Sequence, residues 1–162
     1  MASIHDVAAY ILQQLGTSVS TMKLQKLCFL AQGWNLGFLN RQLFAEDFEA
    51  WAKGPVAYAL FDRHRGKYTV GSWSGNPAAL GHQERIIVDA VLRNYGALTG
   101  LQLSEITHEA DSPWARTRIA EGIRDGQSSN STISKNVIRE YYADKLIVTN
   151  AGSSHSASQQ VH

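Results

Sequence analysis

The stretch that decides the fold contains three short segments: KLQKL at residues 23–27, AQGW at 31–34 and EAWAKGPV at 49–56. Apolar residues recur every three or four positions across the first two segments, which is the spacing of one face of an α-helix. The third segment is short and aromatic, and it contains a Gly-Pro pair, which interrupts regular structure. The order therefore predicts a helix followed by a short extended element and a break.

The expected helix begins at Ser20 or Thr21 and carries an unusually wide apolar stripe. A stripe this wide predicts a central helix that its neighbours contact on more than one side. The residues of the stripe are Leu24, Leu27, Cys28, Ala31 and Trp34 or Asn35, with Phe29 and Leu36 widening it. Lys23 and Lys26 fall three positions apart on the remaining edge, where we expect both to reach water. Cys28 is the only cysteine and is expected to be a core residue rather than a nucleophile.

After this helix the chain changes to short aromatic segments. Leu43-Phe44 and residues 48–51 are predicted to form a small two-stranded β element. Gly54 is expected to end it, because glycine adopts backbone angles closed to other residues. Pro55 then suits the first turn of a third helix, which would run through Phe61 to about residue 65.

Helical periodicity and capping signals predict the rest of the fold. Further helices are expected at about residues 4–15 and 81–95, and after Thr99, Ser112, and Thr132 or Ser134. Residues 66–81 are expected to form a surface loop with a strand near 68–70. We predict one compact, mainly α domain of about six helices with a small β-hairpin, spanning residues 1–147. Residues 148–162, rich in Ser, Gly and His, are expected to be a disordered tail.

Composition limits the possible functions. The chain has 162 residues, 44% of them hydrophobic and 18% charged, which describes one ordinary globular domain. A single cysteine excludes an internal disulfide and a zinc site built on several thiolates. No signal peptide and no span of about 20 apolar residues is visible, so we expect no membrane contact and a cytoplasmic location.

No recognisable catalytic or metal-binding motif is present. The six histidines show no metal-ligand spacing, and His108-Glu109 lacks the second histidine of a metalloprotease helix. We expect His108 to satisfy backbone groups where the fifth helix ends. No nucleophile elbow or phosphate-binding glycine loop occurs. The expectation is a protein without enzymatic activity, metal or cofactor.

The net charge of +1 does not imply a nucleic-acid partner. Lys23 and Lys26 could form a basic cluster with residues 63–67 and contact phosphates. Asp6, Glu46, Asp47, Glu49 and Asp62 dilute that field, so we regard DNA binding as the weaker alternative.

The tryptophans suggest an interaction module. Trp34, Trp51 and Trp114 are expected to be core anchors. Trp73 lies in the glycine-rich loop, and an exposed tryptophan is the residue type most enriched at interface hot spots. We therefore expect Trp73 to be exposed and available to a partner.

Taken in order, the motifs resemble the SocA-like, or Panacea, antitoxin domain, which includes the phage-associated protein GepA. The resemblance covers roughly residues 7–146 and is most specific in two pieces, the Ala-Trp-x-x-Gly-Pro-Val segment at 50–56 and the Thr-His-Glu segment at 107–109 with its following Pro-Trp. The residues of the structural motif are Trp34, Trp51, Gly54, Pro55, Phe61, His108, Pro113 and Trp114. The family often has a tyrosine before the glycine, where this chain has Lys53.

The resemblance implies an antitoxin that neutralises a cognate protein toxin, usually encoded beside it, by direct contact. One alternative is a proteolytic adaptor that delivers the toxin to a ClpXP-type protease, and another is a DNA-binding or regulatory phage-associated protein. The candidate toxin contacts are Lys23, Lys26, Lys53, Tyr58 and Trp73. Trp51 and Phe61 are expected to support them from beneath.

Overall fold

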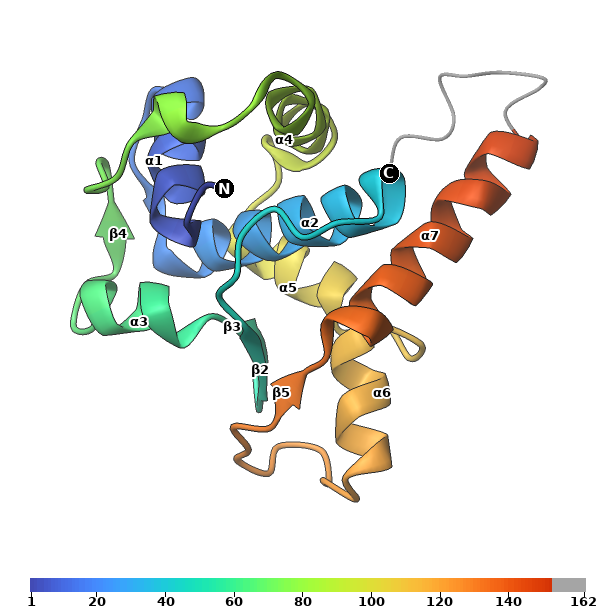
Figure 1. Ribbon diagram of the computed structural model, residues 1–162. Helices are drawn as coiled ribbons and strands as arrows, with labels where there is room; N and C mark the ends of the chain where they lie inside the picture. The colour runs from blue at the N-terminus through green and yellow to red at the C-terminus, as the bar shows by residue number, and fades with distance from the viewer. Residues whose placement is uncertain (153–162) are drawn as a thin grey trace.

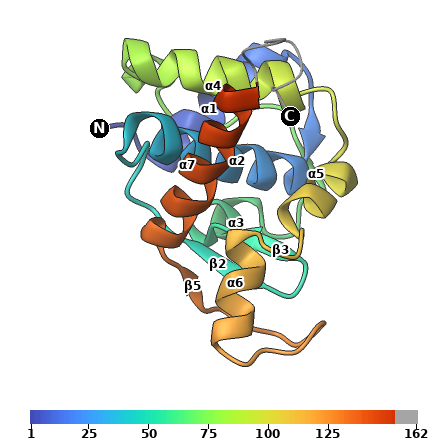
Figure 2. The ribbon, with the colours of Figure 1, turned by 90° about the vertical axis from the view of Figure 1, so that its right-hand side faces the viewer.

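A long central helix organises the fold. In the computed structural model, which describes residues 1–152 and the side chains of residues 1–145, this helix is α2 (Thr21–Leu39). Other helices surround it on several sides, and α7 (Lys135–Gly152) crosses it at an angle (Figures 1 and 2). The prediction of a mainly α domain with a small β element is confirmed.

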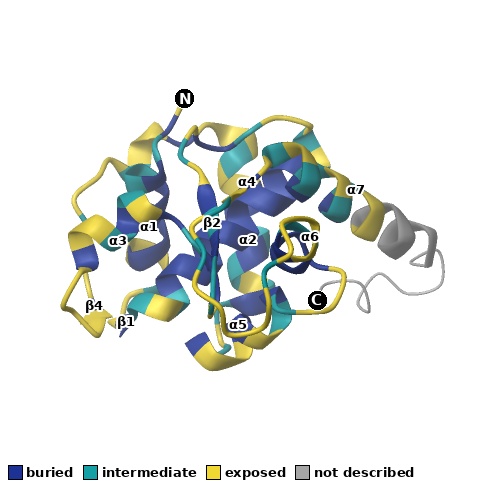
Figure 3. Cartoon of the chain, turned by 90° about the horizontal axis from the view of Figure 1, so that it is seen from below, coloured by how far each residue is buried: buried dark blue, intermediate teal, exposed yellow. Residues whose placement is uncertain are grey.

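The remaining helices are short and lie around α2. They are α1 (Ile4–Leu15), α3 (Tyr58–His64), the single 3₁₀ turn η1 (Pro77–Ala79), α4 (His82–Tyr95), α5 (Gly100–Thr107) and α6 (Pro113–Ala120). Viewed from below, buried residues concentrate on α2 and on the strand beside it, whereas exposed residues mark the outer turns of α5 and α6 (Figure 3).

The described residues also form two small antiparallel sheets. In the first, β1 (Val19–Ser20) pairs with β4 (Thr69–Val70), which confirms the strand expected near residue 70. The second has the order β3-β2-β5 and joins β3 (Gly54–Val56), β2 (Phe48–Trp51) and β5 (Thr132–Ile133). Trp51 pairs with Gly54 next to the hairpin turn.

The hairpin differs from the predicted one. Strand β2 pairs with Gly54–Val56 and not with Leu43-Phe44, whose side chains are buried in an irregular segment. Gly54 therefore begins a strand instead of ending the element, and the third helix begins at Tyr58 instead of Pro55. Proline is tolerated because β3 is at the edge of its sheet, where a missing N–H interrupts no further ladder.

Helix starts follow the expected caps. Ser3 and Asp6 form a capping box on α1, and Thr99 and Gln102 form another on α5. The Ser112 hydroxyl accepts the Ala115 N–H at the start of α6. Helix α7 continues to Gly152, past the expected tail start at residue 148, and residues 153–162 of that tail lie outside the described residues.

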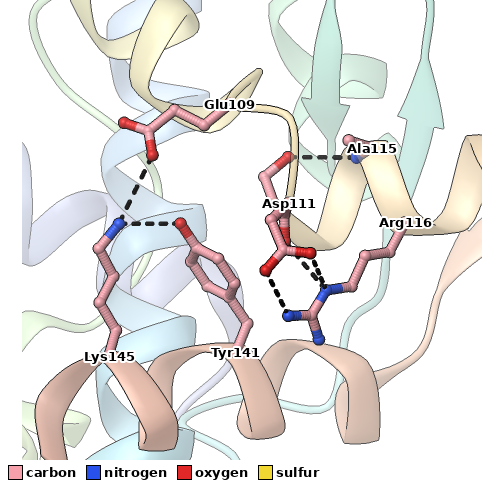
Figure 4. Close-up of polar contacts among 7 residues, drawn as sticks. Glu109, Asp111, Ala115, Arg116, Tyr141 and Lys145 are labelled. Carbon is pink, nitrogen blue, oxygen red and sulfur yellow. Dashed lines mark hydrogen bonds and ion pairs between the residues drawn. The ribbon is translucent and has the colours of Figure 1, made fainter. Parts of the chain in front are cut away.

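The turn between α5 and α6 is tied to α7 and to α6 itself (Figure 4). Lys145 Nζ lies 3.6 Å from a Glu109 carboxylate oxygen and donates to the Tyr141 hydroxyl at 2.9 Å. Arg116 donates to both carboxylate oxygens of Asp111, at 3.2 and 2.9 Å. These pairs are largely solvent-exposed, so we expect them to orient the turn more than to stabilise the fold.

Polar side chains of α2 bond the backbone of the segment that follows it. Gln25 forms two hydrogen bonds with Ala57, accepting from its N–H at 2.8 Å and donating to its carbonyl at 3.1 Å. Gln32 accepts the Leu43 N–H at 2.7 Å and donates to the Phe44 carbonyl at 2.8 Å. Both glutamines are almost fully buried. The two glutamines thus provide hydrogen-bond partners for backbone N–H and C=O groups of this segment that are not paired within a β-sheet.

Gly33 lets α7 approach α2 closely. A Cβ atom at this position would overlap the ring of Tyr142, which is buried against α2 and also contacts Phe29 edge to face. Any side chain at position 33 must therefore move Tyr142. This explains the glycine of the AQGW segment in a helix interior, where glycine is otherwise unfavourable.

This packing predicts the sign of the effect of Gly33→Ala. Helix propensity alone would stabilise the variant by about 1 kcal/mol. Because the new methyl group overlaps the Tyr142 ring, we expect destabilisation by about 1–3 kcal/mol instead, measured by urea denaturation. In a Tyr142→Leu background the same substitution should cost less. A stabilised Gly33→Ala single variant contradicts this account of the helix crossing.

Candidate functional site

A groove of about 660 Å³ lies between the start of α2, the β2–β3 hairpin and α3. The loop that precedes β5 borders it on another side. Its lining residues are Thr21, Met22, Gln25, Lys26, Trp51, Ala52, Lys53, Val56, Phe61, His64, Ser128, Ser129 and Asn130. The size is within the range of ligand-binding clefts. Several of these residues belong to the segments that the sequence analysis singled out.

Aromatic side chains form one wall of the groove. The rings of Trp51 and Phe61 meet edge to face, with their centroids 4.9 Å apart. Trp51 is held from both ends: its Nε1 donates to Glu49 at 2.7 Å, and its carbonyl accepts from Trp114 Nε1 at 2.6 Å. The guanidinium of Arg65 lies 4.9 Å from the Phe61 ring centroid. The wall is thus fixed by contacts with Glu49, Arg65 and Trp114, none of which lines the groove.

Lys26 is the most unusual residue of the groove. Its side chain is only 3% exposed, and Nζ donates to the Pro55 carbonyl oxygen at 3.1 Å. Burial lowers the pKa of Lys26 to about 8, because the charged form loses solvation. The expectation that Lys26 reaches water is wrong: the β2–β3 hairpin folds over this edge of α2 and covers it.

Gln25 and His64 lie beside Lys26. The Gln25 amide nitrogen is 3.1 Å from His64 Nε2, and burial lowers the pKa of His64. Gln25 thus links α2 both to the backbone before α3 and to the last residue of that helix. Gln25 was not among the predicted site residues, although a polar residue within the apolar stripe of a helix is a signal for such a role.

Gly54 lies where the segment at residues 50–56 meets the segment that contains His108 and Trp114. Its φ of +125° is unfavourable for other residues, and a Cβ atom would lie 3.0 Å from His108 Cε1 and 3.1 Å from Lys26 Cε. His108 packs on Trp114, with ring centroids 4.1 Å apart, and its Nδ1 lies 2.6 Å from the Ser104 carbonyl oxygen. The prediction that His108 satisfies backbone groups at the end of α5 is confirmed.

The structure separates the predicted contact residues. Lys53 and Tyr58 are exposed, as expected, and Lys53 lines the groove. Lys23 is half-buried, and its Nζ donates to the Gly96 carbonyl at 2.6 Å. The lysine edge of α2 is therefore occupied by intramolecular contacts and does not form a free basic surface with residues 63–67.

Trp73 is not the exposed loop residue that was expected. It is half-buried, its Nε1 lies 3.0 Å from His5 Nδ1, and its ring stacks on that of His5. The glycine-rich loop thus uses Trp73 to attach to α1. Trp34 and Trp114 are buried core anchors as predicted, whereas Trp51 is only half-buried because one side of it lines the groove.

Among the side chains of residues 1–145, no cluster of three or more His, Cys, Asp or Glu is arranged to hold a metal ion. Within residues 1–152, no helix combines the length and the apolar character needed to cross a membrane.

Comparison with known families agrees with the motifs. Residues 24–115 match the family model described as antitoxin SocA-like, Panacea domain. This match covers more than half of the chain, so the protein belongs to the SocA-like antitoxin family, and the resemblance seen in the sequence is confirmed. Membership supports an antitoxin role in general terms and a toxin as the partner. No curated protein and no solved structure matches the chain.

The positive φ of Gly54 predicts a stability effect. We expect Gly54→Val to lower the free energy of unfolding by about 1–3 kcal/mol, because a β-branched residue is strained at this φ. Lys53→Val, in the same turn but exposed, serves as the control and should change stability by about 0.5 kcal/mol or less. Equal melting of Gly54→Val and the parent contradicts the role assigned to Gly54.

The buried Lys26 predicts pH-dependent stability. Between the folded pKa of about 8 and the ordinary value of 10.5, the unfolded chain binds more protons at Lys26 than the folded chain does. The free energy of unfolding contributed by Lys26 therefore rises with pH across this window. Relative to Lys26→Met, the parent should gain about 1–2 kcal/mol between about pH 7.5 and 9.5.

The measurement is urea denaturation at several pH values in that window. Lys67→Met removes an exposed lysine and should keep the parental pH dependence. If Lys26→Met shows the same pH dependence as the parent, Lys26 is not the desolvated group described above.

Proposed function

We propose that this protein neutralises a cognate protein toxin by binding it directly, without turnover chemistry, and that the groove and its rim form the contact surface. The observation that carries the proposal is the position of the groove. Most of its lining residues lie within the part of the chain that matches the antitoxin family model, and the segment at residues 49–56 forms one of its sides.

The rim has the residue types that bind proteins well. The rim consists of Met22 and Lys53, which line the groove, and of Tyr58, whose ring centroid lies 5.9 Å from that of the groove residue Phe61. Tyr58 and Met22 are exposed by 46% and 37%, and Lys53 lies in the hairpin turn between β2 and β3. Arg65 donates to the Tyr58 hydroxyl at 2.8 Å and lies over the Phe61 ring, which orders this part of the rim before any partner arrives. An ordered aromatic rim lowers the entropy cost of association.

The test begins with the products of neighbouring genes. One of them should arrest growth when expressed alone and allow growth when this protein is co-expressed, and the two should co-purify as a stable complex. Rescue without any complex contradicts neutralisation by binding. If rescue instead coincides with loss of the toxin, and depends on a ClpXP-type protease, the adaptor mechanism replaces occlusion.

A rim variant tests the contact surface. Lys26 is unsuitable for charge reversal, because a buried glutamate would disturb folding. We therefore expect Lys53→Glu with Tyr58→Ala to weaken toxin binding by on the order of tenfold or more, with little change in melting temperature, because both side chains are exposed.

The matched control is Ile86→Ala with Arg93→Glu on α4, which lies across α2 from the hairpin (Figure 1). Both control residues are exposed and neither lines the groove. The control pair should retain parental binding and rescue. If the rim pair folds normally and binds as tightly as the control pair, the toxin contacts another face.

A further inference from the structure

The groove has a one-sided charge. Its lining residues include two lysines, Lys26 and Lys53, and none is Asp or Glu. Burial lowers the pKa of the third basic residue, His64, which favours its neutral form. The groove therefore favours an anionic group over a cationic one. The net charge of the whole chain is only +1, so this preference belongs to the groove and not to the molecule as a whole.

Lys26 is almost fully buried, but it is one of the residues that line the groove, and its ammonium group has unused hydrogen-bonding capacity there. An ammonium group has three N–H donors, and among the described residues the hydrogen-bond partner of Nζ is the Pro55 carbonyl oxygen. No carboxylate of those residues lies within 4.0 Å of it. A buried charge without a counter-ion is costly, and a carboxylate from outside the chain would reduce that cost.

The surroundings of Lys26 restrict what can carry the carboxylate. Met22, Trp51, Val56 and Phe61 line the groove with apolar surface. A small hydrated anion would leave this surface unused. An acidic residue next to an apolar one would pair with Lys26 and bury apolar area in the same step.

We propose that the groove binds a segment of the toxin in which an Asp or Glu side chain pairs with Lys26 Nζ and a neighbouring apolar side chain packs on Trp51 and Phe61. This assignment rests on the proposed function, because it takes the partner to be the neutralised toxin. It adds the chemistry of the recognised segment.

The first experiment uses a phage-displayed random peptide library selected on the full-length protein. Enriched peptides should contain an Asp or Glu adjacent to an aromatic or aliphatic residue. They should bind Lys26→Met on the order of tenfold or more weakly than the parent, and Lys67→Met as well as the parent. Selection that yields no binders, or binders without an acidic residue, overturns the proposal.

A second readout needs no variant of the protein. An enriched peptide is synthesised with an amidated C-terminus, so that its acidic side chain is the source of the carboxylate, and compared with its Glu→Gln or Asp→Asn form. The amide form should bind on the order of tenfold or more weakly. Equal binding overturns the pairing with Lys26. Restored binding by a free C-terminal carboxylate on the amide form assigns the groove to chain ends instead, which also overturns it.

Failure here is distinguishable from failure of the proposed function. If Lys26→Met folds, rescues growth and binds the toxin like the parent, the acidic-segment proposal is wrong and neutralisation by binding stands. If the parent forms no complex with any toxin, the proposed function fails before the groove is tested.

Discussion

The rest of the structure depends on hydrogen bonds from buried polar side chains of α2 to the backbone of residues 41–57. Gln25, Lys26, Gln32 and Asn35 bond to Ala57, Pro55, Leu43 with Phe44, and Arg41. A typical hydrogen bond contributes only about 1 kcal/mol net, but a buried group left without a partner costs about 1–3 kcal/mol. The segment therefore has one favourable position against the helix, and an irregular stretch of chain is held there without a large sheet.

Because of these hydrogen bonds, α2 both packs in the hydrophobic core and positions the hairpin that borders the groove. On one side, Gly33 admits Tyr142 and lets α7 cross α2 closely. On another, the hairpin is fixed by Gln25 and Lys26 so that Trp51 and Lys53 border a groove rather than filling it. A lysine in such a position is poorly solvated in the free protein. In the proposed complex, a carboxylate of the partner offsets that cost.

Features that depend on neighbouring residues could be predicted from the sequence. Features that depend on contacts between residues far apart in the sequence could not. Helix α2, the caps at Ser3, Thr99 and Ser112, and the burial of Cys28 follow from periodicity and capping, which act within a few residues. The burial of Lys26 depends on a hairpin about 25 to 30 positions further along the chain. The partial burial of Trp73 depends on His5, which is 68 positions earlier in the sequence. Pro55 was placed in a helix because its preference for a first helical turn is local, whereas its place on a sheet edge is set by pairing with Ala50. The groove could not be predicted for the same reason, because its lining residues come from separate stretches of the sequence and meet only in the folded chain.

The most direct test of the central claim is native-state amide hydrogen exchange at Leu43 and Ala57, whose N–H groups donate to Gln32 and Gln25. If these glutamines hold the segment to α2 as one unit, both amides should exchange only through global unfolding, with the same free energy and denaturant dependence as the central amides of α2. Exchange of Leu43 and Ala57 through a local opening, while α2 stays protected, would contradict the claim that these hydrogen bonds fix the hairpin and the groove.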